Sequence, residues 1–256
     1  QWQSINIQIM QESNLALSDQ LYQNGLKDTL RIATKRGSNI TGTPNHRLRV
    51  VNDNGEYAWK YLSEISVGDE VIRRLGGHQE LLANKPYMAL QIPKNTINQK
   101  TVRLPAELTE DVAYLLGLYM GDVKDHYTKK EGVGLAICDD DPSVVEFVRH
   151  VFREEMGITV IEDTSSGCTL ADSTALVDWF EVNGFTGNGA FIPQVVLQSR
   201  TSVLAAFISG LFAADGTVEH CYVELSTVSK NLANQVKVSL ESMGIVTTVS
   251  QHGTLG

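Results

Sequence analysis

Two apolar segments far apart in the chain share one pattern of hydrophobic and small residues. Residues 115–122 read LLGLYMGD and residues 208–216 read ISGLFAADG, each with a glycine among apolar residues and an aspartate at or near its end. Such apolar runs predict two buried helices. Because glycine has no Cβ, the helices can cross at close range along their small residues. We therefore expect Asp122 and Asp215 to emerge side by side.

The pattern that follows each segment is also repeated, which indicates an internal duplication. We predict repeats at 109–187 and 201–256, of αββαββα form, with the second lacking its last strand and helix. Glu110 and Asp111 mark the start of the first helix, and Asp141 followed by Pro142 marks the next. The further predicted elements are strands at 133–137, 158–162, 168–171, 218–225 and 245–250, a helix at 174–183, and a helix with Leu232, Val236, Leu240 and Met243 on one face.

The first hundred residues show no helical period and predict a small all-β unit. Strand candidates at 2–10, 19–22, 29–34 and 48–51 are separated by turn dipeptides such as Asn24-Gly25. The predicted class is therefore α+β, with an all-β domain at 1–76 and the duplicated domain at 109–256.

The stretch between them, 77–108, is interpreted as a linker or small connecting region. The alternative is that its basic residues contact phosphates, namely Lys85, Lys94, Lys100 and Arg103.

Two carboxylates at the ends of paired helices repel unless a cation lies between them, and Mg²⁺ suits such oxygen ligands. At this point residues 207–217, preceded by Ile192-Pro193, resemble the LAGLIDADG homing endonucleases; the first segment departs by having Val123 where that family usually has glycine. The resemblance implies a monomer with an internal pseudo-two-fold axis that cleaves double-stranded DNA. It places Mg²⁺ at Asp122, Asp215, Gly121 and Ala214.

A second resemblance is carried by residues 40–50, ITGTPNHRLRV, together with Trp59-Lys60 and the later Val67-Gly68-Asp69-Glu70-Val71. This run resembles the Hint domain of inteins, which splice themselves out of flanking exteins without a cofactor. The resemblance implies that His46 protonates the leaving amide nitrogen of the N-terminal splice junction and that Thr43 orients the same peptide. The alternative is that residues 43–46 are only a turn.

Both splice-junction ends are missing from this sequence. It starts at Gln1 rather than at a nucleophile, and no terminal histidine and asparagine block precedes Gly256. We therefore expect an internal portion of a longer intein, unable to splice as it stands. The host protein and the DNA target cannot be read from it.

Charge argues against tight DNA binding. Residues 1–108 carry 13 Lys and Arg against 10 Asp and Glu, whereas residues 109–256 carry 8 against 20. The strands that the family resemblance directs toward DNA are acidic or uncharged, although phosphate binding needs cations. The LAGLIDADG enzymes that this chain resembles also place a lysine just before the Ile-Pro, where this chain has Ala190. In the first repeat, Lys100 and Lys124 are the candidates for that role. A degenerate, non-cleaving insertion therefore stays open.

The remaining composition indicates the cellular location and the kinds of partner to expect. The chain has no apolar run of membrane-spanning length, so no membrane partner is expected. Three cysteines without even pairing or metal spacing favour a reducing, cytoplasmic location. Aromatic residues make up 7% of the chain, and we predict no stacking platform for single-stranded nucleic acid.

Overall fold

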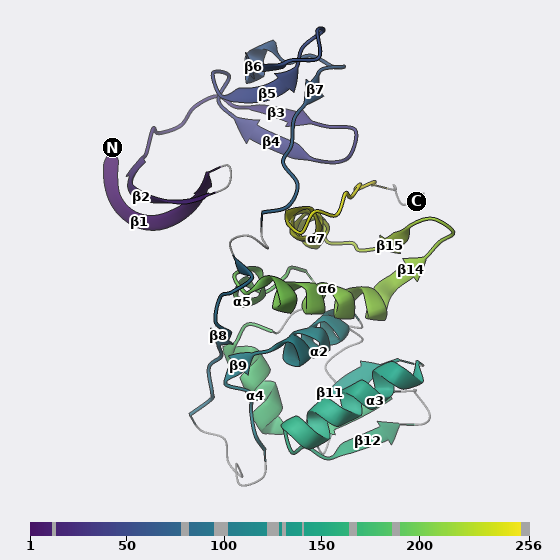
Figure 1. Ribbon diagram of the computed structural model, residues 1–256. Coiled ribbons are helices and arrows are strands. Elements are labelled where there is room, and N and C mark those ends of the chain that lie inside the picture. The colour runs from purple at the N-terminus through teal and green to yellow at the C-terminus, as the bar shows by residue number, and fades with distance from the viewer. Residues whose placement is uncertain are drawn as a thin grey trace. The chain divides into compact units, whose positions relative to one another are not determined.

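The computed structural model describes residues 1–11, 14–77, 82–94, 102–121, 128–129, 132–139, 141–163, 168–185 and 190–251. The chain divides into two compact units (Figure 1). One unit comprises Gln1–Leu81 with Leu240–Gly256, and the other comprises Leu82–Ser239. No helix among the described residues is long and apolar enough to cross a membrane.

The described part of Gln1–Leu81 is built from antiparallel strands and one short 3₁₀ helix, η1. The predicted strands at 2–10, 19–22, 29–34 and 48–51 are confirmed, as β1, β2, β3 and β5, and three further strands pair with them. The sheets are β1 (Trp2–Gln11) with β2 (Asn14–Tyr22), β3 (Leu30–Ala33) with β4 (Asn39–Gly42), and β6 (Tyr57–Tyr61), β5 (Arg47–Val51) and β7 (Glu70–Val71) in that order, with η1 at Leu62–Glu64.

The end of the chain belongs to the same β-rich unit. The Gly76 amide donates to the Glu241 carbonyl oxygen at 2.8 Å, and Arg73 forms an ion pair with the Glu241 carboxylate at 2.6 Å. The predicted strand at 245–250 is wrong. Residues 245–250 form no strand ladder: the Ile245 amide donates back to the Leu240 carbonyl oxygen at 2.9 Å, and the Val249 amide donates to the Arg36 carbonyl oxygen at 3.3 Å.

The first repeat forms a four-stranded antiparallel sheet with helices packed against it. Asp141 caps α3 as predicted, since its side chain accepts from the Ser143 amide, and Pro142 occupies the first turn. After α3 the helix continues as a π-helical turn, which the sequence pattern did not predict. The elements are the sheet β10 (Thr128–Lys129), β11 (Gly132–Cys138), β13 (Cys168–Asp172), β12 (Val160–Asp163), and the helices α2 (Glu110–Gly121), α3 (Pro142–His150), η2 (Val151–Glu155) and α4 (Thr174–Val182).

The core of this unit is aromatic. Trp179, Phe180 and Phe185 are fully buried and meet edge to face, and Tyr119 of α2 adds its ring to Phe180 at 4.9 Å. Buried aromatic side chains of this size contribute more stability than any other residue type. The contact with Tyr119 fixes α2 against α4, so the first apolar helix is held by the repeat that follows it.

Cysteine pairing differs from the expectation. Cys168 is disulfide-bonded, and Cys138 stands opposite it in the register of β11 and β13. Cys221 is free and exposed. An odd number of cysteines therefore does not exclude a disulfide, because the strand register brings together two positions thirty residues apart.

The second repeat differs from its predicted form in one strand. The predicted strand at 218–225 is two short strands joined by a turn, because the Glu219 amide donates to the Tyr222 carbonyl oxygen at 2.9 Å. The predicted helix through Leu232 and Val236 is confirmed as α7. The elements from the linker onward are β8 (Met88–Ala89) paired with β9 (Glu107–Leu108), α5 (Gln194–Leu197), α6 (Thr201–Asp215), β14 (Gly216–Val218) paired with β15 (Val223–Leu225), and α7 (Lys230–Ser242).

Candidate functional site

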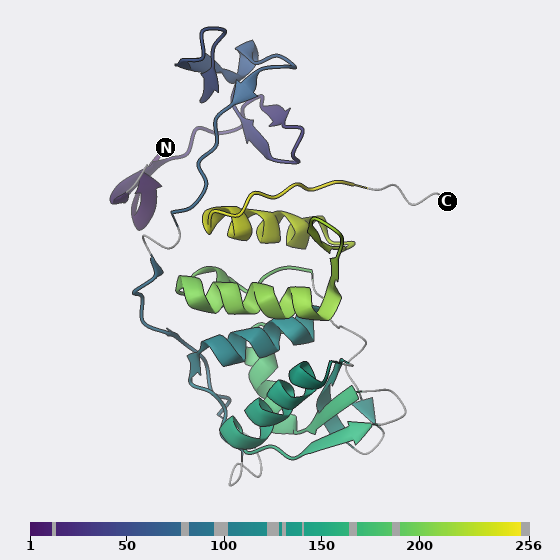
Figure 2. The same cartoon turned by 45° about the vertical axis from the view of Figure 1, so that its right-hand side comes forward.

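The two apolar helices α2 and α6 lie side by side and run in the same direction (Figure 2). Gly117 and Gly210 form their crossing point, as predicted. A Cβ built on Gly117 would lie 2.7 Å from the Leu211 nitrogen and closer still to the Phe207 carbonyl oxygen. A Cβ on Gly210 would lie 3.0 Å from the Leu118 nitrogen and closer to the Tyr114 carbonyl oxygen. Only glycine permits this backbone-to-backbone contact.

The C-terminal ends of the two helices also meet. A Cβ built on Gly121 would lie 2.6 Å from the Cβ of Ala214. Gly121 ends α2 and Ala214 precedes the last residue of α6, so the two predicted metal-site positions with small side chains are brought together. Asp122 directly follows Gly121 but lies outside the described residues, as do Lys100 and Lys124.

Asp215 is the last residue of α6, and its surroundings disfavour a negative charge. The described residues offer its carboxylate no hydrogen bond or ion pair, and partial burial raises the pKa of Asp215. The C-terminus of a helix carries partial negative charge, which also opposes a carboxylate there. A cation would relieve all of these costs, so the position fits a metal ligand. Among the described residues no group of three or more His, Cys, Asp and Glu side chains gathers.

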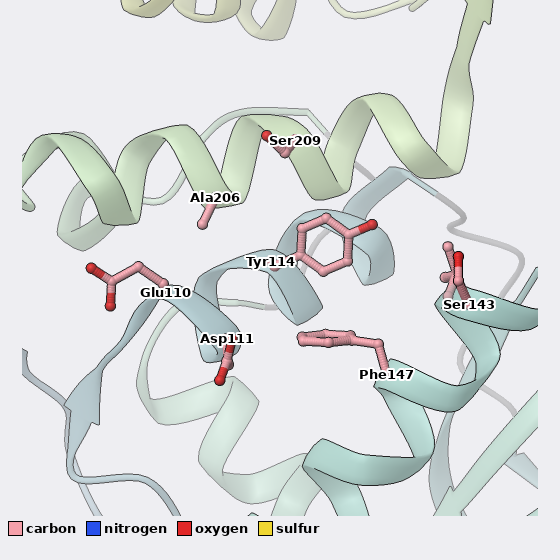
Figure 3. A pocket seen from close by; sticks show the side chains of 8 residues that line it. Glu110, Asp111, Tyr114, Ser143, Phe147, Ala206 and Ser209 are labelled. Atoms are coloured by element: carbon pink, nitrogen blue, oxygen red, sulfur yellow. The ribbon is translucent and has the colours of Figure 1, made fainter.

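The opposite end of the helix pair holds a feature that the sequence did not indicate. An open hollow of about 360 Å³ lies between the first turns of α2, helix α3 and helix α6 (Figure 3). The Tyr114 and Phe147 rings meet edge to face beside it at 4.9 Å. Its lining residues are Glu110, Asp111, Tyr114, Ser143, Val144, Phe147, Ala206 and Ser209.

Glu110 joins the starts of the two helices. The Ser202 hydroxyl donates to Glu110 Oε1 and the Tyr87 hydroxyl donates to Glu110 Oε2, both at 2.6 Å. Burial opposes ionisation of Glu110, but these hydrogen bonds outweigh it and lower its pKa. The Arg200 guanidinium lies over the Tyr87 ring at 5.1 Å and adds positive charge nearby. The sequence pattern gave Glu110 only a helix-start role, since its partners come from distant segments.

Glu155, at the end of η2, behaves in the opposite way. Burial, followed by the neighbouring Asp111 carboxylate, raises the pKa of Glu155, and His150 opposes this only in part. A neighbouring negative charge disfavours the ionised form of a carboxyl group.

Two basic residues of the linker make contacts within the fold. Arg103 donates to the Glu154 carbonyl oxygen at 2.6 Å through its side chain, and the Lys85 Nζ lies 3.5 Å from the Gln198 carbonyl oxygen. These bonds do not favour the alternative that the linker cations contact phosphates.

Residues 43–46 of the β-rich unit form a turn, in agreement with the alternative interpretation of their geometry. The His46 amide donates to the Thr43 carbonyl oxygen at 2.9 Å, and the Thr43 hydroxyl donates to Asn45 Oδ1 at 2.7 Å. The His46 carbonyl oxygen accepts from the Leu62 amide at 2.8 Å, which fixes the turn against η1. The imidazole of His46 is exposed. The splicing roles of His46 and Thr43 stay a prediction.

A segment that includes most of the second apolar helix is similar to a known family of domains. Residues 202–255 match the family of LAGLIDADG-like domains, which confirms the resemblance seen in residues 207–217.

Among similar proteins, the replication factor C small subunit of Methanocaldococcus jannaschii is 23% identical over 233 residues, covering 88% of this chain and 11% of that protein. The DNA gyrase of Mycobacterium kansasii has a subunit that is 24% identical over 259 residues, covering 93% of this chain and 42% of that protein. The crystal structure of I-DmoI in complex with DNA and Mn matches with a TM-score of 0.44 at 19% identity, over 58% of this chain and 85% of that one. The chain thus spans less than half the length of either curated relative.

Proposed function

We propose that this chain is part of an intein and carries a LAGLIDADG homing endonuclease that cleaves double-stranded DNA with Mg²⁺. The observation that carries the proposal is the α2–α6 pair, which crosses at two glycines and ends where Gly121 meets Ala214. In the sequence Asp122 follows Gly121 and Asp215 follows Ala214, so we propose that the two aspartates serve one metal site.

In this proposal each residue at the helix ends has a separate task. Asp215 and Asp122 hold the ion, while Gly121 and Ala214 keep the helix ends close enough for both carboxylates to reach it. Mg²⁺ held there would supply stabilisation of the charge on the scissile phosphate. Lys100 is proposed to support that phosphate from the first half, and duplex DNA is the partner.

The intein part of the proposal is supported by where similar segments occur. Nearly all of this chain matches part of a DNA gyrase and part of a replication factor C, two proteins of different function. A segment that recurs inside unrelated proteins behaves as an insertion. The exposed His46 in its turn is consistent with a residue that meets an external peptide bond, so His46 and Thr43 are proposed to act at the junction with an extein.

A second candidate function is a folded insertion that no longer cuts DNA. The strands β10, β12, β13 and β15 carry Lys129 against Glu162, Asp163, Asp172 and Glu224, which weakens attraction to phosphates. Ala190, at the position of the expected lysine, offers only its carbonyl oxygen, which accepts from the Ser229 hydroxyl at 2.7 Å.

Selection from a randomised duplex library separates the two candidates. The full chain is incubated at low salt with the library and Mg²⁺, and cut molecules are recovered by ligation and sequenced. The endonuclease proposal predicts a recurring cut sequence, lost in Asp215→Asn and kept in Glu219→Gln, an exposed acid four residues further on. Binding without cutting would support the inactive insertion, and absence of binding would end the endonuclease proposal.

A further inference from the structure

One face of the sheet formed by β5 and β6 alternates arginine with aromatic side chains. Opposite residues in an antiparallel pair project on the same face. The register pairs Arg47 with Tyr61 and Arg49 with Trp59, and Tyr57 stands at the end of the same row. All of these side chains are exposed: Tyr57 keeps 72%, Trp59 58% and Tyr61 41% of its surface.

The arginines lie over the rings instead of pairing with acids. The Arg49 guanidinium carbon lies 5.1 Å from the Trp59 ring centre and 6.0 Å from that of Tyr57, and the Arg47 carbon lies 5.7 Å from that of Tyr61. A guanidinium stacked in this way keeps its in-plane N–H donors directed outward. No described carboxylate forms an ion pair with Arg47 or Arg49. Both charges are thus available to an anion.

The rest of the sheet separates this face from other charges. Glu70 of β7 is paired with Val51 and therefore lies at the edge of the face, beyond the two arginines. The other face carries the buried Val50 and the ion pair between Lys60 and Asp69 at 2.7 Å. The side chains of Arg47 and Arg49 leave the strand two residues apart, about 7 Å, a distance comparable to one extended nucleotide.

We propose that this Arg-aromatic face, Arg47, Arg49, Tyr57, Trp59 and Tyr61, binds single-stranded nucleic acid. Bases stack on the exposed rings and phosphates contact the two guanidinium groups, a combination that tolerates any sequence. A duplex hides the faces of its bases, so the rings select the single strand. This site lies in the β-rich unit and does not depend on the metal site proposed at Asp215. It departs from the expectation that the few aromatic residues form no stacking platform.

Binding is measured by fluorescence anisotropy of a labelled twelve-nucleotide oligothymidylate added to the full chain at low salt. Trp59→Leu is expected to weaken binding about 5- to 150-fold, the loss of one stacked base. Trp2→Leu is the matched control, because Trp2 is also exposed (66%) but lies on β1, and it should bind as wild type does. Arg49→Gln should reduce the slope of log affinity against log salt by about 0.7.

Further arms identify the ligand chemistry. Asp215→Asn should bind the oligonucleotide unchanged, which separates this face from the endonuclease proposal. Tyr57→Leu repeats the stacking test at the most exposed ring, in case Trp59→Leu does not fold. The inference is overturned if the wild type does not bind, if the duplex of the same length binds more tightly, if inorganic polyphosphate competes equally per charge, or if Trp2→Leu loses as much affinity as Trp59→Leu.

Discussion

Replacing Gly210 with alanine tests the helix crossing on which the proposed metal site depends. The added Cβ would lie 3.0 Å from the Leu118 nitrogen and closer to the Tyr114 carbonyl oxygen. Both are backbone atoms held by helical hydrogen bonds, so relief requires α2 and α6 to separate. Overpacking a core typically costs about 1–3 kcal/mol. Because this contact is between rigid backbones, we expect a cost of about 3 kcal/mol. Alanine regains about 1 kcal/mol of helix propensity, which leaves a net loss of about 2 kcal/mol.

The loss is measured by thermal unfolding followed through tryptophan fluorescence. Trp179 is fully buried in the Leu82–Ser239 unit, whereas Trp2 and Trp59 are exposed, so the signal reports this unit. A loss of about 2 kcal/mol lowers Tm by about 4–8 °C for a unit of this size.

The neighbouring Ser209→Ala is the control, because Ser209 is exposed on the same helix and gains helix propensity without a clash. It should leave Tm unchanged or slightly raised. A Gly210→Ala protein as stable as Ser209→Ala would refute the close crossing. The double variant Gly117→Ala/Gly210→Ala should lose less stability than the sum of the two single variants. Once one Cβ has separated the helices, the second is accommodated at lower cost.

Three more predictions concern charge and the splice turn. The raised pKa of Glu155 means that the folded state takes up its proton more readily than the unfolded chain, so this stability is present at low pH and lost as pH rises through the folded pKa. Glu155→Gln should therefore raise Tm at pH 7 and flatten its pH dependence, while exposed Glu154→Gln should do neither. The pKa of Asp215 is also raised, so Asp215→Asn should likewise raise Tm at neutral pH in the absence of metal. An unchanged Tm would contradict the conclusion that the ionised Asp215 carboxylate destabilises the fold. In an intein that contains this chain together with its splice junctions and exteins, His46→Ala should block cleavage at the N-terminal junction, and normal cleavage on a gel would remove His46 from the mechanism.

Local signals in the sequence predicted the features that depend on one or two residues. The glycines within apolar runs predicted the helix crossing, and Asp141 before Pro142 predicted the start of α3. Both follow from steric and hydrogen-bonding properties of the residues themselves. Residues 245–250 show the limit, because their β-branched pattern says nothing about whether a partner strand is present.

Features that depend on register could not be predicted in the same way. Tyr57, Trp59 and Tyr61 alternate visibly in the sequence, but only the pairing of β5 with β6 brings Arg47 and Arg49 over their rings. The hydrogen bonds of Glu110 to Tyr87 and Ser202 likewise join three segments that no spacing relates. Charge counts over whole domains did not indicate the Arg-aromatic face or the Glu110 cluster, because such counts average over surfaces that the folded chain separates.

The proposed Mg²⁺ site at the helix ends is tested most directly by metal-dependent thermal stability. Mg²⁺ is titrated into the wild type, Asp122→Asn, Asp215→Asn and the control Glu219→Gln, and Tm is followed through Trp179 fluorescence. An ion held by both carboxylates should stabilise the wild type and Glu219→Gln, by about 2.7 kcal/mol at a hundred times Kd. Either asparagine variant should lose the shift. Equal shifts in all four proteins, or none in the wild type, would contradict a metal site between Asp122 and Asp215.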